Sequence, residues 1–212
     1  GRMYQARYLT GIVAGLQTKT NHMGYIASYP VPEVIRGINA FTLGVRSVNP
    51  QAVVHVRWAW SWEDAAKEKR TAEDLLSVEP VDILVQHQNR NNLAEVAKAH
   101  HIYMIGYNAA YKDDYTDTLL TAAVWDWTSF YRQRLQEYRA GSFCGKNYAA
   151  DLKDGTVEVV PLADFVVPEA QTQVDAAKAR LCTGGWDIFY GPVYDQNGWL
   201  RVRAGETMSD AQ

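Results

Sequence analysis

Extended and helical segments alternate along most of this chain, and this alternation limits the folds that the chain can adopt. Five short apolar segments predict strands, at residues 22–29, 52–60, 81–88, 102–107 and 119–124. Segments with helical signals follow four of them, as at Val34, Ile38, Phe41 and Val45, which form one apolar helix face. Strands separated by helices of this length indicate βαβ units. The predicted fold class is therefore α/β, with a doubly wound parallel sheet covered by helices on both faces.

The predicted strands and helices divide the chain unevenly. Residues 22–141 hold five strands and four helices, enough for one complete lobe. Residues 1–21 hold a helix at 4–18, and residues 142–212 hold irregular extended segments, a helix at 168–182 and a hairpin that turns at Asn197-Gly198. Neither segment forms a lobe alone. We therefore expect residues 1–21 and 142–212 to pack together as part of a second lobe, with hinge segments.

Charge and composition exclude several classes of protein. The 212 residues include 21 Lys and Arg against 24 Asp and Glu, a net charge of −3, whereas nucleic-acid binding needs clustered basic charge. No stretch approaches the ~20 apolar residues of a membrane span, and no secretory signal segment is evident at the start. Cys144 and Cys182 allow either one disulfide bridge or two separate thiols.

The residues that follow the predicted strands predict a binding site. In an open parallel sheet, ligands bind beyond the carboxyl ends of the strands. The candidates there are Glu33, Trp62, Asn89, Asn108 and Trp127. Aromatic rings and amides with few carboxylates suit a planar, largely uncharged ligand such as a nucleobase or nucleoside. Alternative roles remain open: Glu33 as a partner of a helix dipole, Asn89 as a loop cap, and Trp62 as a packing residue.

Catalytic and metal-binding motifs are missing from the sequence. The five histidines match neither HExxH nor a Cys/His metal spacing, and GxSxG, the P-loop and GxGxxG do not occur. We therefore expect no enzyme activity, no cofactor and no metal site.

Five segments in order resemble the basic membrane protein family, also called Bmp or Med, of substrate-binding lipoproteins of ABC importers. They are YQARYLTGIVAG, YIASYPVPEVIRGINAF, VDILVQHQ, LLTAAVWDWTSFY and GPVYDQNG. The resemblance covers nearly the whole chain. It implies a type I periplasmic-binding-protein fold of two lobes, of which roughly a hundred N-terminal residues are absent here.

The resemblance also implies a function. It implies a purine nucleoside or base as the ligand, no cofactor, a membrane permease as the partner, and an extracytoplasmic or periplasmic location. The membrane would be reached only through a lipid anchor that is absent from this chain. Where related sequences carry acidic patterns after the third and fourth strands, this chain has Gln88-Asn89-Arg90 and Ala109-Ala110-Tyr111. The alternative is an accessory or interaction protein that keeps this lobe but binds no ligand.

Overall fold

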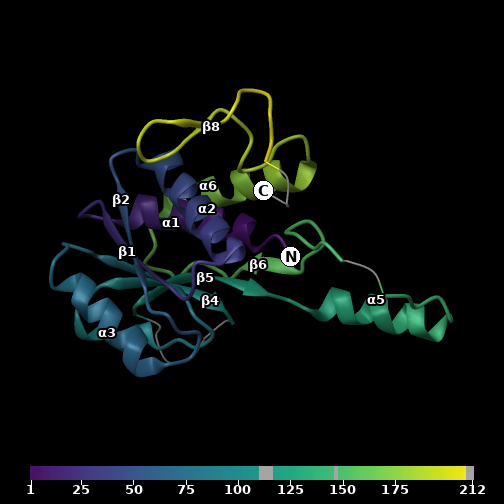
Figure 1. Cartoon of the computed structure of the whole chain (residues 1–212), viewed down its shortest axis with the longest axis horizontal. Coiled ribbons are helices and arrows are strands. Elements are labelled where there is room, and N and C mark those ends of the chain that lie inside the picture. Colours follow the sequence, from purple (N-terminus) through teal and green to yellow (C-terminus); the bar gives the residue numbers. More distant parts are fainter. Residues whose placement is uncertain (110–116, 146–147, 209–212) are drawn as a thin grey trace.

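Five parallel strands form the centre of the computed structural model, which describes residues 1–109, 117–145 and 148–208. The strands are β1 (His22–Ala27), β2 (Val53–Trp58), β3 (Ile83–His87), β4 (Tyr103–Asn108) and β5 (Leu119–Trp125). A sixth strand, β6 (Val157–Val159), pairs antiparallel with β5. The spatial order is β2-β1-β3-β4-β5-β6 (Figure 1). The predicted α/β class and its mostly parallel sheet are confirmed.

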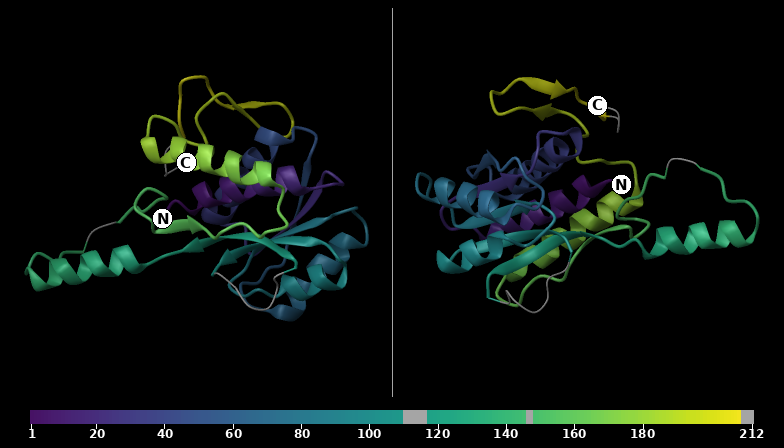
Figure 2. Two further views of the ribbon diagram at one scale, coloured as in Figure 1. Left: turned by 180° about the vertical axis from the view of Figure 1, so that it is seen from behind. Right: turned by 60° about the horizontal axis from the view of Figure 1, so that its bottom comes forward.

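Helices cover both faces of this sheet (Figure 2). One face carries α1 (Met3–Gln17), α2 (Pro32–Val48) and α6 (Pro168–Thr183). The other carries α3 (Ala65–Leu76) and α4 (Leu93–Ala99). Local sequence explains two of the helix starts: Pro32 occupies the first turn of α2, and the Asp64 carboxylate accepts a hydrogen bond from the Lys67 amide at 3.1 Å. Each layer buries its own apolar cluster against the sheet.

Helices α1 and α2 pack unusually closely because glycines lie at their contact. A Cβ atom on Gly44 would lie 2.1 Å from the Tyr8 carbonyl oxygen, and one on Gly11 would lie 2.2 Å from the Phe41 carbonyl oxygen. No side chain fits at either position without moving the backbone of the other helix. The two glycines therefore fix the distance between α1 and α2.

The segments outside residues 22–141 also contact the main sheet. Strand β6 extends the sheet beside β5, and α1 lies between α2, α6 and the strands. All residues of α1 except Leu16 are buried. A helix buried on every side needs neighbours all around it, and in this chain the main sheet and its helices supply them.

Helix α5 (Thr128–Arg139), expected inside the lobe of residues 22–141, instead projects away from it (Figures 1 and 2). None of its twelve residues is buried. Four large apolar side chains at or within it are exposed, and helical spacing places them on one side: Trp127, Tyr131, Leu135 and Tyr138. An exposed apolar face of this size is typical of a surface that packs against a partner.

The C-terminal region contains the predicted hairpin. Strands β7 (Val193–Tyr194) and β8 (Leu200–Val202) pair antiparallel, with Gly198 in the turn at a φ of 79°. Cys144 and Cys182 are both free thiols. Ala110 and Tyr111 lie outside the described residues. Among the helices of the described ranges, none has the length and apolar character needed to cross a bilayer.

Candidate functional site

Aromatic side chains line the carboxyl edge of the sheet beside β1, β2 and β3. The Tyr29 ring lies 6.0 Å from both the Trp60 and the Trp62 ring centroids, and Trp62 lies 6.5 Å from the His87 ring. The backbone N–H of Asn89 donates a 2.9 Å hydrogen bond to the Trp62 carbonyl oxygen, which connects the loop after β2 to the loop after β3. We call Tyr29, Trp60 and Trp62 the aromatic rim.

A polar cluster lies beneath the aromatic rim. His87, the last residue of β3, has its Nδ1 atom 2.8 Å from the Tyr25 hydroxyl and its Nε2 atom 3.4 Å from the Glu33 carboxylate. Its ring packs 4.5 Å from that of Tyr107. His87 thus joins β1, β3, β4 and the first turn of α2. Among these side chains Glu33 alone reaches solvent, with 43% of its side chain exposed.

Arg7 brings a buried positive charge to this cluster from α1. Its Nη2 group donates a 2.9 Å hydrogen bond to the Gln86 carbonyl oxygen. Its guanidinium carbon lies 4.3 Å from the Tyr107 ring centroid and 5.5 Å from that of Tyr25. These ring faces partly replace the water that the guanidinium loses on burial.

The environment sets the charge of each group. Burial, with the nearby charge of Arg7, lowers the pKa of His87 to about 4 despite the opposing effect of Glu33. Burial opposes ionisation of Glu33, but His87 and Arg7 outweigh it and hold the pKa of Glu33 below its usual value. Burial raises the pKa of Tyr107 to about 12. At neutral pH the cluster therefore holds one carboxylate, one guanidinium and a neutral imidazole. This arrangement offers a hydrogen-bond acceptor beside aromatic surfaces.

Acidification is expected to destabilise the chain through His87. Its ordinary pKa is 6.5 and its folded pKa about 4, so between these values the unfolded state binds more protons. The contribution of His87 to the free energy of unfolding is fully present above pH 6.5, and it falls by about 3 kcal/mol as the pH approaches 4. The variant His87→Asn lacks the titrating group. Urea unfolding at a series of pH values should show the wild-type stability falling toward that of the variant across this window. A difference that stays constant with pH would contradict the expectation.

Two of the predicted site residues meet at His87. Glu33 forms the 3.4 Å ion-pair contact from α2, and Trp62 packs its ring edge-on against the imidazole. Trp62 also packs against the buried core, so the same side chain belongs both to the core packing and to the aromatic rim. His87 therefore links an acidic and an aromatic candidate.

The other three predicted residues lie in different settings. Asn89 is exposed, and its side-chain amide donates a 3.1 Å hydrogen bond to the carboxylate of Glu63 in the loop after β2. Asn108 ends β4 with a φ of 76°, in the left-handed region that asparagine tolerates. Trp127 stacks on Trp125 with ring centroids 5.1 Å apart at the start of α5. Of these three residues, Asn89 contacts Trp62 through its backbone N–H.

The buried members of the cluster were missed by sequence reasoning. Arg7, Tyr25 and Tyr107 lie inside apolar segments, and none was selected as a site residue. One signal was available, since Arg7 is the only charged residue in α1, a helix that is otherwise uncharged. His87 was likewise not among the predicted site residues.

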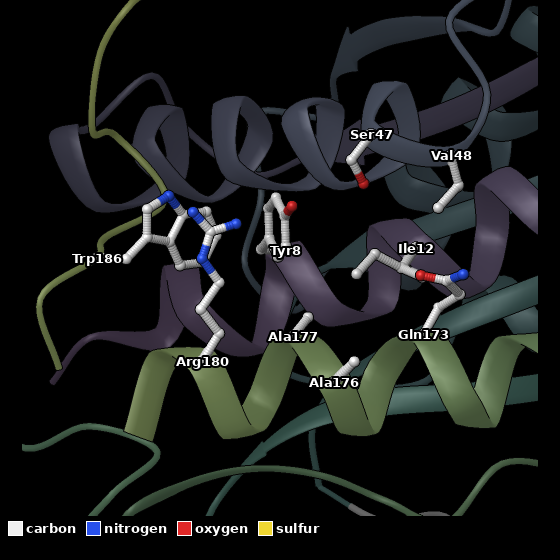
Figure 3. A pocket seen from close by; sticks show the side chains of 9 residues that line it. All are labelled: Tyr8, Ile12, Ser47, Val48, Gln173, Ala176, Ala177, Arg180 and Trp186. Carbon is white, nitrogen blue, oxygen red and sulfur yellow. The ribbon is translucent and has the colours of Figure 1, made fainter. Parts of the chain in front are cut away.

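A separate groove of about 240 Å³ lies between α1, α2 and α6 (Figure 3). Its walls include Ser47 and Val48 at the end of α2 opposite Glu33, so the groove does not adjoin the aromatic rim. At one end Arg180 lies 4.1 Å from the Trp186 ring centroid. The lining residues are Tyr8, Ile12, Ser47, Val48, Gln173, Ala176, Ala177, Arg180 and Trp186.

Comparison with known proteins gives a consistent result. The model of the family described as ABC transporter substrate-binding protein PnrA-like matches residues 1–182. A purine-binding protein of Brucella abortus is 34% identical over 99% of this chain, and a Haloferax volcanii protein proposed to bind glucose for an ABC transporter is 32% identical over 92%. The chain spans 59% and 50% of their respective lengths.

Solved structures agree with these sequence relatives. A solute-binding protein of an ABC transporter from Conexibacter woesei is 26% identical, with a TM-score of 0.72 over 87% of this chain and 62% of its own. One from Aeropyrum pernix is 15% identical, with a TM-score of 0.74 over 92% of this chain and 66% of its own, and supports the fold alone.

Proposed function

The chain belongs to the family of PnrA-like ABC transporter substrate-binding proteins, and we propose that it forms one face of a cleft that binds a purine nucleoside or nucleobase. The aromatic rim above Glu33 and His87 is the observation that carries this proposal. The family consists of binding proteins rather than enzymes. A small molecule is the expected ligand, and an ABC permease, which the protein would meet at the outer face of the membrane, is the expected partner. A lipid anchor outside this chain would hold the protein there.

The chemistry of the rim favours a purine. The Trp62 indole offers a flat surface for stacking of a base, and the ionised Glu33 carboxylate accepts hydrogen bonds from ring N–H or ribose hydroxyl groups. The name of the Brucella relative supports the same ligand class. The Haloferax relative makes glucose the second candidate, because sugars also stack on aromatic rings and donate hydroxyl groups to carboxylates.

The second face of the cleft would come from a second lobe. The Brucella relative is longer than this chain, which spans 59% of it, so its remaining length can supply a lobe. The apolar side of α5 is the surface on which such a lobe would pack. Segment 126–145 is then part of the second lobe, and β5 and β6 are the strands that cross between the lobes.

Leu135 tests this assignment of α5. Its side chain is 58% exposed, so Leu135→Ala should change the stability of the chain alone by less than about 0.5 kcal/mol. In a protein with both lobes Leu135 becomes buried, and the same change should cost about 2 kcal/mol or more. Gln136→Ala, on the opposite side of α5, is the control that should be neutral in both proteins. Equal, small effects of Leu135→Ala in both proteins, measured by urea unfolding, would refute the assignment.

Calorimetry tests the ligand class. The protein for this test joins the chain to the part of the Brucella relative that lies outside the match. Titrations with adenosine, guanosine, inosine, adenine and glucose are compared at the same protein concentration. The proposal expects heat from at least one purine and none from glucose. If glucose alone binds, a sugar and not a purine is the ligand class. If the folded protein binds none of the five compounds, the non-binding alternative is favoured.

A further inference from the structure

Two histidines and one carboxylate gather near the amino ends of β1 and β2, at the edge of the sheet opposite the aromatic rim. His22 is the first residue of β1, and His55 pairs in register with Gly24 on the neighbouring β2. Because strand side chains alternate, His22 and His55 lie on the same face of the sheet. Glu79 reaches this face from the loop between α3 and β3.

The three side chains are close together. His22 Nδ1 lies 2.8 Å from His55 Nε2, and the two rings stack with centroids 5.1 Å apart. Glu79 Oε1 lies 3.4 Å from His55 Nδ1. One ligand atom from each residue lies within 4.8 Å of the other two. All three residues are partly exposed, so an ion has access to them from solvent.

We propose that His22, His55 and Glu79 bind a divalent cation of the zinc type, with water completing its coordination. Two imidazole nitrogens and one carboxylate oxygen are a donor set that Zn²⁺ takes in proteins. Tetrahedral bonds of about 2.0 Å place ligand atoms about 3.3 Å apart, so small side-chain movements suffice. The cation takes the place of the hydrogen bond between the two imidazoles, and the proton of that bond moves to the other nitrogen of its own ring, so that both rings bind as neutral imidazoles.

The surroundings of His55 and Glu79 favour metal binding. Burial is the main reason that the pKa of His55 lies below its usual value, and His22 and Arg57 add to this effect against the attraction of Glu79. His55 is therefore neutral at pH 7, and neutral imidazole is the form that binds metals. The backbone of Glu79 is held on both sides, since its N–H donates to the Leu75 carbonyl at 3.0 Å and its carbonyl accepts from Val81 at 2.8 Å.

The spacing of these residues along the chain provides no reason to expect this site. His22, His55 and Glu79 are separated by 33 and 24 residues, whereas metal motifs place ligands a few residues apart. The absence of HExxH and of Cys/His spacings led to the expectation of no metal site. Parallel pairing of β1 with β2 is what brings the two histidines together.

The test uses Co²⁺ as a spectroscopic probe and Zn²⁺ as its competitor on the full chain at neutral pH. Visible absorption reports Co²⁺ in a site with imidazole and carboxylate ligands, and equilibrium dialysis gives the number of Zn²⁺ ions bound. The variants are His55→Ala and Glu79→Gln, and the second leaves both imidazoles in place. His100→Ala is the matched control, because His100 forms an exposed ion pair with Glu73 at 2.7 Å outside the cluster. Circular dichroism confirms the fold of each variant.

The proposal expects one Co²⁺ per chain that Zn²⁺ displaces. Loss even of an outer partner of a metal ligand weakens binding by roughly 10–100-fold, so loss of a direct ligand in His55→Ala or Glu79→Gln should weaken it by at least about tenfold. His100→Ala should bind as the wild type does. Wild-type protein that binds no stoichiometric Co²⁺ or Zn²⁺ would overturn the proposal, as would wild-type affinity in folded Glu79→Gln or His55→Ala.

Discussion

Replacing Gly44 with alanine is expected to destabilise the chain by about 2–4 kcal/mol, because the new methyl group has no space. Its Cβ would lie 2.1 Å from the Tyr8 carbonyl oxygen, well inside contact distance. Overpacking of this kind typically costs 1–3 kcal/mol, and here the obstacle is backbone rather than a flexible side chain. Alanine favours a helix over glycine by about 1 kcal/mol, which offsets only part of the cost. Helices α1 and α2 must move apart, and Arg7 on α1 would move away from the polar cluster.

Urea unfolding measures this effect against two further variants. Gly11→Ala places a methyl group 2.2 Å from the Phe41 carbonyl oxygen across the same contact, so it should cost a similar amount. Gly145→Ala adds a methyl group with nothing within 4 Å and should change stability by less than about 0.5 kcal/mol. If Gly44→Ala behaves like Gly145→Ala, the close packing of α1 on α2 is wrong.

Replacing Trp62 with alanine is expected to remove most of the stacking surface for the ligand in the two-lobed protein. Stacking of a base on an aromatic side chain contributes about 1–3 kcal/mol, which corresponds to roughly a 5- to 150-fold rise in the dissociation constant. Trp62→Phe keeps a flat ring and should lose less affinity. Trp199→Ala is the matched control, because Trp199 is 69% exposed in the β7–β8 hairpin.

Calorimetric titration with the best-binding purine distinguishes the outcomes for Trp62. Because Trp62 also packs against the core, thermal melts must establish that Trp62→Ala is folded at the titration temperature. Unchanged affinity in the folded variant would remove Trp62 from the site. Reduced affinity in Trp199→Ala as well would indicate a general effect of losing a tryptophan.

Local sequence patterns predicted the main sheet because each strand and helix of residues 22–125 carries its own signal. Apolar runs mark the strands, and Asp64 and Pro32 mark helix starts that the structure contains. Short β6 lies in a segment that was expected to be extended, but its pairing with the free edge of β5 has no local signal. Tertiary contacts rather than local patterns also place α1 against the sheet and its helices. The family resemblance is confirmed by the family model.

The candidate site was only partly predictable from sequence. The rule that ligands bind beyond strand ends selected Glu33 and Trp62, and both of them contact His87. The same rule does not specify where a side chain points, and Asn89 donates its hydrogen bond to Glu63. The buried Arg7 reaches the cluster from a helix that precedes all of the strands, which no strand-end argument could identify.

The claim that this lobe forms half of a purine-binding cleft is tested most directly by titrating adenosine into the 212-residue chain and into the two-lobed protein side by side. One lobe covers one side of a ligand, and a second aromatic face alone adds about 1–3 kcal/mol. The account predicts that the two-lobed protein binds at least about tenfold more tightly than the chain alone. Equal affinity of the two proteins, or no adenosine binding by a folded two-lobed protein that also ignores guanosine, inosine and adenine, would contradict it.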